Sequence, residues 1–420
     1  MKPPANSARG SGTPPQDGGV PPNIVFFAPD ISDVSTIKRA QAFIDHGYGV
    51  TVVGFRRDRY NREYRPQWPC ILVGRTRDGR YGQRLLSLFS SLPIVLAHGR
   101  TLKAASVIYT RNIDQLLLAL IARKIVGSRA PIVYEVLDIP AILVEHGIGS
   151  TLLRWLERRA LRQVSVLVLS SPGFHRNYYQ PVQHYGGAWL LVENRLHPSA
   201  LQYVDAGRKQ PRVDQDRRRG YQWVVGYVGL IRGKATFDLI TRLAERLSDR
   251  VLFKFSGVLT TVDEHRFMRA LSRHKNIIYE GAYVNPRDLG AIYPKIDFVW
   301  ALDLEHVAHN SRWLLPCRFY EAGLFGKPCL AVRDFEVGRF IEKLGVGWTF
   351  SEPFEESLVR FFETVTPEEY ADKRDRLRAL PLDTFIAGDE VADIFRLLGH
   401  PPRGEAPQPY KTVAEDAALR

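Results

Sequence analysis

A glycine-bearing run with two basic residues has the chemistry to bind a phosphorylated ligand. It reads Gly226-Tyr-Val-Gly229-Leu-Ile-Arg232-Gly233-Lys234 and follows directly from a predicted strand. Small residues let backbone N–H groups approach a phosphate, and the N-terminus of the next helix adds partial positive charge. Arg232 and Lys234 can pair with the anion. The spacing fits neither a P-loop nor a dinucleotide fingerprint, so a glycine turn with two solvated basic residues is the alternative.

A second run, NSRWLLPCRFYEAGLFGKPCLA at positions 310–331, places polar residues on a predicted helix. Pro316 suits an early helix position, and Arg318 and Glu321 follow it. A carboxylate near a helix N-terminus can accept two ribose hydroxyls, and the backbone N–H groups at 314–316 can meet a diphosphate or a sugar. The alternatives are a surface glutamate and an arginine that pairs along the same helix face.

Two other constellations have less support as chemical sites. Glu305-His306-Val-Ala-His309 has the wrong order for a zinc-protease helix and lacks a third ligand, so no metal and no cofactor are predicted. Ser171 lacks the Gly-x-Ser-x-Gly context of a nucleophilic serine.

The elements that position these runs alternate between short apolar strands and amphipathic helices. This alternation predicts an α/β protein with two doubly wound, Rossmann-like domains that face a cleft. Strands are expected at 24–28, 50–55, 107–109, 132–136, 166–169, 223–227, 251–255, 276–279, 298–301 and 329–332. Helices are expected at 34–46, 114–124, 237–247, 264–272, 288–293, 317–325, 335–344 and 390–398.

Composition changes mark the domain boundaries. Residues 1–22 and 401–420 are rich in Pro, Gly and polar residues, which predicts two disordered tails. The expected order between them is an N-terminal domain at 23–200, a polar linker at 201–220, a C-terminal domain at 221–385 and a final helix within 386–400.

The net charge of +13 favours an anionic partner. Arginines alternate with apolar residues between Arg75 and Lys103, which predicts an interfacial segment on an anionic membrane; an internal helix with solvated ends is the alternative. Nucleic acid is not expected, because no recognised binding module is present. With three cysteines, no secretory leader and no apolar run of about 18 residues, the expected location is the cytoplasm, with peripheral attachment to the inner face of the membrane.

The 310–331 run resembles the donor-site motif of family-4 (group 1) retaining glycosyltransferases, which have the GT-B fold. The matching positions are Pro316, Arg318, Glu321, Ala322, Gly326 and Pro328. The NSRWLLP form is most similar to bacterial enzymes of exopolysaccharide and succinoglycan-type assembly. Further matches spread over residues 23–398 and include Gly229 with Arg232, Gly281–Val284, Val133–Asp138, Ser170–Phe174 and Val192–Arg195.

The resemblance implies transfer of a hexose from a nucleotide-sugar, expected to be a UDP-sugar, to a lipid-linked or oligosaccharide acceptor with retention. The implied donor-binding residues are Gly229, Arg232, Tyr283, Val284, Leu315, Pro316, Arg318 and Glu321. The implied catalytic residues are Asp138, Arg232 and Lys234, and the implied acceptor-side residues are Asp30, Ser32, Arg111 and Asn112. For Asp30 and Asp138, ordinary helix caps are the alternative.

Three positions depart from the family pattern. Trp313 stands where many members have the first of two glutamates, Leu137 stands where many have a histidine, and the segment 30–35 replaces a glycine-rich loop. The alternatives to a transferase are therefore a UDP-sugar epimerase of similar fold and a non-catalytic protein that binds a nucleotide-sugar or another anionic ligand.

Overall fold

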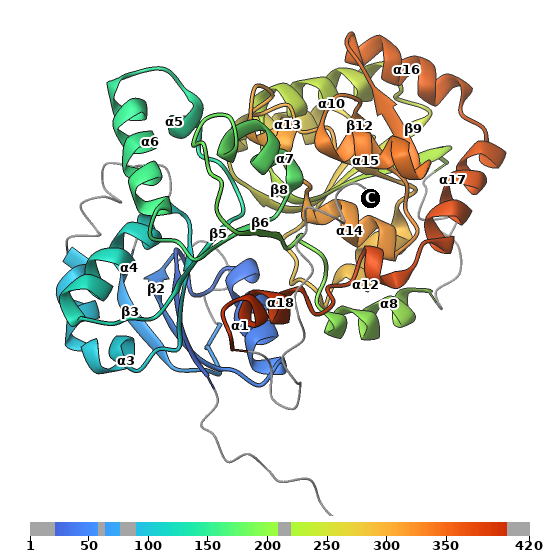
Figure 1. Ribbon diagram of the computed structural model, residues 1–420. Helices are drawn as coiled ribbons and strands as arrows, with labels where there is room; N and C mark the ends of the chain where they lie inside the picture. Colours follow the sequence, from blue (N-terminus) through green and yellow to red (C-terminus); the bar gives the residue numbers. More distant parts are fainter. Residues whose placement is uncertain (1–21, 58–63, 76–89, 209–219, 401–420) are drawn as a thin grey trace, which may run out of the picture.

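Two parallel sheets form two lobes in the computed structural model, which describes residues 22–57, 64–75, 90–208 and 220–400 (Figure 1). The first sheet has the order β3-β2-β1-β4-β5-β6-β7 and the second β10-β9-β8-β11-β12-β13. Each order runs outward in both directions from the first strand of its lobe, which is the doubly wound arrangement predicted above.

The strands of the first lobe are short, and most of their residues are buried. They are β1 Asn23–Ala28, β2 Gly49–Arg56, β3 Cys70–Arg75, β4 Val107–Arg111, β5 Ile132–Val136, β6 Val166–Leu169 and β7 Trp189–Leu191. Those of the second lobe are β8 Trp223–Ile231, β9 Val251–Leu259, β10 Ile277–Gly281, β11 Phe298–Trp300, β12 Cys329–Val332 and β13 Gly347–Phe350. Continuous apolar runs form these strands because helices cover both faces of a parallel sheet.

The helices of the first lobe are α1 Val34–Asp45, α3 Gly99–Lys103, α4 Ile113–Val126, α5 Ala141–Val144, α6 Ile148–Leu161 and α7 Pro172–Phe174, followed by a π-helical turn at His175–Tyr179. Along the rest of the chain they are α8 Leu201–Arg208, α10 Lys234–Arg246, α11 Glu264–Arg273, α12 Leu289–Ile292, α13 Asn310–Trp313, α14 Cys317–Leu324, α15 Glu336–Leu344, α16 Phe354–Thr364, α17 Pro367–Ala379 and α18 Glu390–Leu397.

The chain crosses between the lobes twice. It leaves the first lobe after β7, and it returns after α17 so that α18 packs beside α1 (Figure 1). Phe395 of α18 contacts Phe43 of α1 with ring centroids 5.5 Å apart, inside the first-lobe core. The two crossings are paired, since Leu196 N–H donates to the Phe385 carbonyl and Ala387 N–H donates to the Leu196 carbonyl.

The predicted strands and helices are present with small shifts of their ends, and the α/β fold class is confirmed. The elements not predicted include β3, β7, β13, α6, α16 and α17. Helix α8 occupies 201–208 of the predicted linker, and residues 209–219 lie outside the described part of the chain.

Some predictions concern residues that the structure does not describe. The expected tails 1–22 and 401–420 lie outside the described residues apart from Pro22, as do residues 76–89 of the predicted interfacial segment. Among the helices that the structure does describe, none combines the length and apolar character needed to cross a membrane.

Candidate active site

The end of β8 forms a cradle of closely packed backbone in the second lobe. Gly229 has a φ of +112°, and a Cβ added to Gly257 on β9 would lie 1.7 Å from the Gly229 carbonyl oxygen. Both positions therefore require glycine, because any side chain would clash or strain the backbone. The cradle opens towards the start of α10, where free N–H groups point out of the helix.

Arg232 lies beside this cradle and is fixed by an acidic residue. Its Nη2 and Nε atoms donate to Asp303 Oδ2 at 2.6 and 3.0 Å. Burial lowers the pKa of Arg232, but the neighbouring Asp303 and Asp138 carboxylates raise it by more, so the guanidinium is charged. The predicted cation is thus present at the strand end, held in one orientation.

Arg318 of α14 is the second cation of this lobe. Its guanidinium lies over the Tyr227 ring, 4.4 Å from the centroid, and its Nη1 donates to the Trp300 carbonyl at 3.1 Å. Burial raises the pKa of Asp303, but Arg232 and Arg318 lower it by more, which brings both cations to one carboxylate. The alternative of a partner on the same helix face is therefore wrong for Arg318.

Glu321 is buried at the next turn of α14 and not on the surface. It is 5% exposed, and its two oxygens accept from Asn285 Nδ2 at 2.6 Å and from the Tyr293 hydroxyl at 2.7 Å. Each oxygen keeps a free lone pair for a further donor. Burial and the nearby Glu321 carboxylate raise the pKa of Tyr283, which places that predicted donor-site residue beside Glu321.

The segment before α14 also differs slightly from the prediction. Pro316 is the N-cap of α14 and lies just outside the helix, with Leu315 before it 1% exposed. Val284, 42% exposed, presents apolar surface next to Tyr283. The predicted donor-side residues thus come together around α14.

Lys234 is not part of this cluster. Its side chain is 71% exposed, and Nζ bonds Asp238 Oδ2 at 2.9 Å, four residues along the same helix. The first turn of α10 directs this side chain along the helix surface and not across the cradle. The structure does not place Lys234 beside Arg232, and its role at the phosphate stays a prediction.

Asp138 follows β5 and faces the second lobe. Burial raises its pKa, whereas Arg232 and a hydrogen bond from Asn310 lower it. It does not cap a helix, because the N-cap of α5 is Pro140. A carboxylate so placed can accept a hydrogen bond from an acceptor hydroxyl.

The β1–α1 loop holds the other predicted first-lobe acid. Asp30 is 2% exposed and accepts from the Ser32 N–H at 2.9 Å and from the Ser32 hydroxyl at 2.7 Å. Burial raises the pKa of Asp30. The N-cap of α1 is Asp33 and not Asp30, so the cap alternative is wrong for Asp30 as well.

Arg111 is the last residue of β4 and Asn112 follows it, and the Arg111 guanidinium is not free for an acceptor. Arg111 is 2% exposed and donates twice to Glu135 Oε2, at 2.8 and 2.6 Å. Asn112 occupies the N-cap position of α4 with a φ of 69°. The assignment of Arg111 to direct acceptor contact is wrong in this arrangement, because its guanidinium is committed to Glu135.

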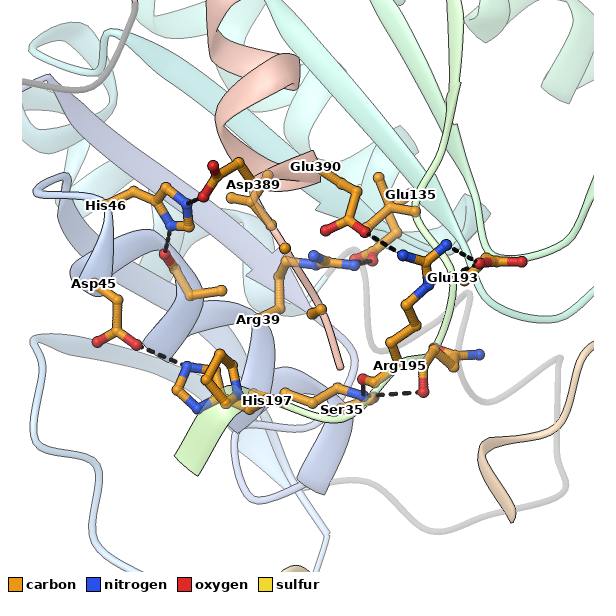
Figure 2. A pocket seen from close by; sticks show the side chains of 18 of the residues that line it. Ser35, Arg39, Asp45, His46, Glu135, Glu193, Arg195, His197, Asp389 and Glu390 are labelled. Atoms are coloured by element: carbon orange, nitrogen blue, oxygen red, sulfur yellow. Dashed lines mark hydrogen bonds and ion pairs between the residues drawn. The ribbon is translucent and has the colours of Figure 1, made fainter. Parts of the chain in front are cut away.

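A pocket of about 150 Å³ lies between α1 and the two crossings, and most of its charged side chains form ion pairs (Figure 2). Arg39 and Arg111 both bind Glu135, and Arg195 binds Glu193 and Glu390. The pairs His197–Asp45 and His46–Asp389 join the same segments. These ion pairs join α1 to β5 and to the two crossings, whereas Lys38 Nζ donates to the Arg195 carbonyl at 2.7 Å.

Several site residues were not found from the sequence. They are Asp303, Asn285, Tyr293 and Asn310, all from loops or short helical turns of the second lobe. Asp303 follows β11 closely, and the rule that strand ends line the cleft would have found it. The other three carry no local pattern.

The two motifs with less support from the sequence, the 305–309 run and Ser171, make contacts within the fold. The rings of His306 and His309 stack with centroids 5.2 Å apart, and in the described ranges no three His, Cys, Asp or Glu residues are grouped to hold a metal. The Ser171 hydroxyl donates to the Trp313 carbonyl.

Known proteins resemble this chain in sequence or in fold. The succinoglycan biosynthesis protein ExoL of Rhizobium meliloti is 29% identical over 359 residues, 84% of this chain and 87% of ExoL. The structure of HepE from Anabaena in complex with UDP matches with a TM-score of 0.66 at 16% identity, covering 90% of this chain and 99% of HepE. WaaG, a glycosyltransferase of lipopolysaccharide biosynthesis, matches with a TM-score of 0.61 at 13% identity, covering 91% of this chain and all of WaaG. No protein-family model matches the chain.

These findings confirm the expected GT-B fold and the resemblance to exopolysaccharide-type glycosyltransferases. Assignment to family 4 and retention of configuration stay predictions, as do the roles of the individual site residues.

Proposed function

We propose that this glycosyltransferase of GT-B fold takes a hexose from a UDP-sugar and transfers it, with retention, to a lipid-linked saccharide in cell-surface polysaccharide synthesis. The observation that carries the proposal is the second-lobe cluster of Arg232, Arg318 and Glu321. It combines two cations with a buried carboxylate, which is the chemistry that a nucleoside diphosphate needs. HepE, with the same fold, has been solved with UDP and with UDP-glucose.

In the proposed donor complex, Glu321 accepts hydrogen bonds from the ribose hydroxyls. The apolar surface of Tyr283 and Val284 lies next to Glu321 and receives the base. The diphosphate lies between the cradle at Gly229 and the guanidinium of Arg232, where backbone N–H groups and the α10 N-terminus complement its charge.

The reaction breaks the bond between the sugar anomeric carbon and the diphosphate oxygen. The acceptor hydroxyl oxygen forms the new bond on the face that the nucleotide leaves, and its proton passes to the departing diphosphate. The charge that develops on the leaving oxygen is stabilised by Arg232 and by helix N-terminal amides. Asp138 orients the acceptor hydroxyl by accepting its hydrogen bond.

Release of UDP from a labelled UDP-sugar tests the proposal. We expect release that depends on added lipid-linked acceptor. Interconversion of the free nucleotide-sugar without acceptor would support the epimerase alternative. Failure of every UDP-sugar to bind would exclude both.

A basic, apolar face on α6 supports the proposed association with an anionic membrane. Ile148, Leu152 and Trp155 are 92%, 56% and 56% exposed, at helical spacing along one stripe. Arg159 and Arg162 continue the stripe and are exposed. Helix α6 stands on the first lobe, the side proposed to receive the lipid-linked acceptor (Figure 1). Apolar side chains can enter the interface while arginines meet anionic headgroups.

Co-sedimentation with vesicles tests this association. We expect binding to phosphatidylglycerol vesicles but not to phosphatidylcholine vesicles, with about tenfold weaker binding when Leu152 and Trp155 are both changed to Ala, because buried apolar area is lost. Met268→Ala, which removes an exposed apolar side chain from the second lobe, is the matched control. Equal binding by both variants would contradict the role of α6.

A further inference from the structure

Helix α13 belongs to the second lobe by sequence but packs into the first. Leu314, which follows it, is 8% exposed within the first-lobe core, and Trp313 packs against the same core. The Ser171 hydroxyl donates to the Trp313 carbonyl at 2.5 Å, and a Cβ on Gly173 would lie 2.5 Å from that oxygen. The second lobe, which is the donor lobe of the proposed function, therefore places the short segment α13 at the carboxyl ends of β5 and β6.

Asn310, the first residue of α13, makes two side-chain hydrogen bonds with the turn after β5. Asn310 is 5% exposed. Its Oδ1 accepts from the Ile139 N–H at 3.1 Å, and its Nδ2 donates to Asp138 Oδ1 at 3.0 Å. A carboxamide is suited to this position because it offers an acceptor and a donor on one planar group.

The Asp138 carboxylate that Asn310 holds is surrounded by charged and titratable groups from both lobes. Arg232 approaches from the end of β8, Asp303 from the turn after β11, and Asp33 from the start of α1. The thiol of Cys317, at the start of α14, is also close. The direction of the Asp138 carboxylate among these groups depends on its hydrogen-bond donor.

We propose that Asn310 is a positioning residue that couples docking of the donor lobe to the orientation and ionisation of Asp138. The inference rests on the proposed function, in which ionised Asp138 receives the hydrogen bond of the acceptor hydroxyl. When α13 is docked, the Asn310 amide favours the carboxylate form and fixes one oxygen. When the lobes separate, Asp138 loses this donor. The acceptor side is thus completed only when the donor lobe is in place.

The test compares Asn310→Ala and Asn310→Asp with Arg176→Ala. Arg176 forms another contact between the lobes, a 2.5 Å ion pair with Glu336, and does not touch Asp138. Turnover is measured as UDP release over a range of pH, UDP affinity by calorimetry and folding by thermal melting. Asn310→Asp keeps the size of the side chain and the acceptor for the Ile139 N–H, and the same melting measurement checks its fold.

For Asn310→Ala we expect kcat to fall about 10- to 100-fold, because a misplaced group loses its reactive geometry. UDP affinity should change less than about threefold, because the donor site is intact. The acid limb of the kcat profile should move to higher pH, because a hydrogen bond that favoured the ionised form is lost. Asn310→Asp should show a larger shift in the same direction, since a second carboxylate replaces the donor. Arg176→Ala should leave the acid limb unmoved.

The inference would be overturned by an acid limb that does not move in Asn310→Asp, or by an Arg176→Ala variant that reproduces the loss and the shift. A wild-type protein that binds no UDP would instead overturn the proposed function, and this inference with it.

Discussion

The two lobes bring different charged groups towards each other. The second lobe contributes the guanidinium groups of Arg232 and Arg318, with Asp303 between them. The first lobe contributes Asp30 and Asp138, whose pKa values burial raises. Guanidinium groups suit a diphosphate, and carboxylates suit the hydroxyls of an acceptor. Under the proposed function, donor and acceptor are recognised on separate lobes, which contact each other at Asn310.

The lobes also differ in how their buried charges are held. Glu135 of β5 is 1% exposed and lies between Arg39 and Arg111, away from the reacting groups. Burial raises the pKa of Glu135, but Arg111 and Arg39 lower it by more, so it lies below its usual value. This triad is a structural support for the first lobe. In the second lobe, the buried Glu321 carboxylate accepts from two neutral donors, Asn285 and Tyr293, and is itself a proposed ligand contact.

The largest expected effect is on stability, and it distinguishes the Glu135 triad from the proposed ligand site. Glu135→Gln should cost about 3–5 kcal/mol of unfolding free energy, because it leaves two buried arginines without their carboxylate. Because the folded pKa is lowered, the wild-type contribution is present above the unfolded value and is lost as the pH falls through the folded pKa. Urea unfolding measures the loss of unfolding free energy. Glu342→Gln, which breaks an exposed pair with Arg333, is the control and should cost less than about 1 kcal/mol. Equal losses would contradict the distinction.

The next effect concerns the second lobe. Arg232→Ala should lower turnover about 10²–10³-fold, because a charge-stabilising donor at the leaving group is lost. Steady-state UDP release measures it. The matched control is Arg242→Ala on α10, which is 54% exposed and pairs with Glu355. Similar turnover in both variants would contradict the role of Arg232 at the leaving diphosphate.

A smaller effect concerns the first lobe. Asp138→Asn should lower turnover about 10²-fold, because an amide cannot act as the charged acceptor. In the wild type, turnover should fall as the pH drops through the raised pKa of Asp138, since the ionised form is the active one. The asparagine variant should lack this acid limb. An acid limb that persists in the variant would assign it to another group.

The sequence predicted the second-lobe site better than the first, for a physical reason. Arg318 and Glu321 lie on one helix, so their spacing alone brings them to one side of the cleft. Asn310 and Asp138 are 172 positions apart, and their contact depends on how the lobes dock. No periodicity encodes such a contact.

The differences from the prediction at Arg111 and Lys234 also arise because side-chain partners depend on the assembled fold. Arg111 lies near a strand end, as predicted, but the fold commits it to Glu135. Lys234 is the first residue of α10, although the predicted helix began at 237, and its Nζ bonds Asp238 on the same helix. Strand and helix positions follow from local apolar patterns, whereas side-chain partners follow from the assembled fold.

Titration of UDP into three proteins tests the central claim most directly. Calorimetry would compare wild type, Glu321→Ala and Asp138→Asn. The account predicts one UDP site in the wild type, about tenfold or more weaker binding in Glu321→Ala through loss of charged hydrogen bonds, and unchanged binding in Asp138→Asn. Absence of UDP binding in the wild type, or equal weakening in both variants, would contradict a nucleotide site built by the second lobe alone.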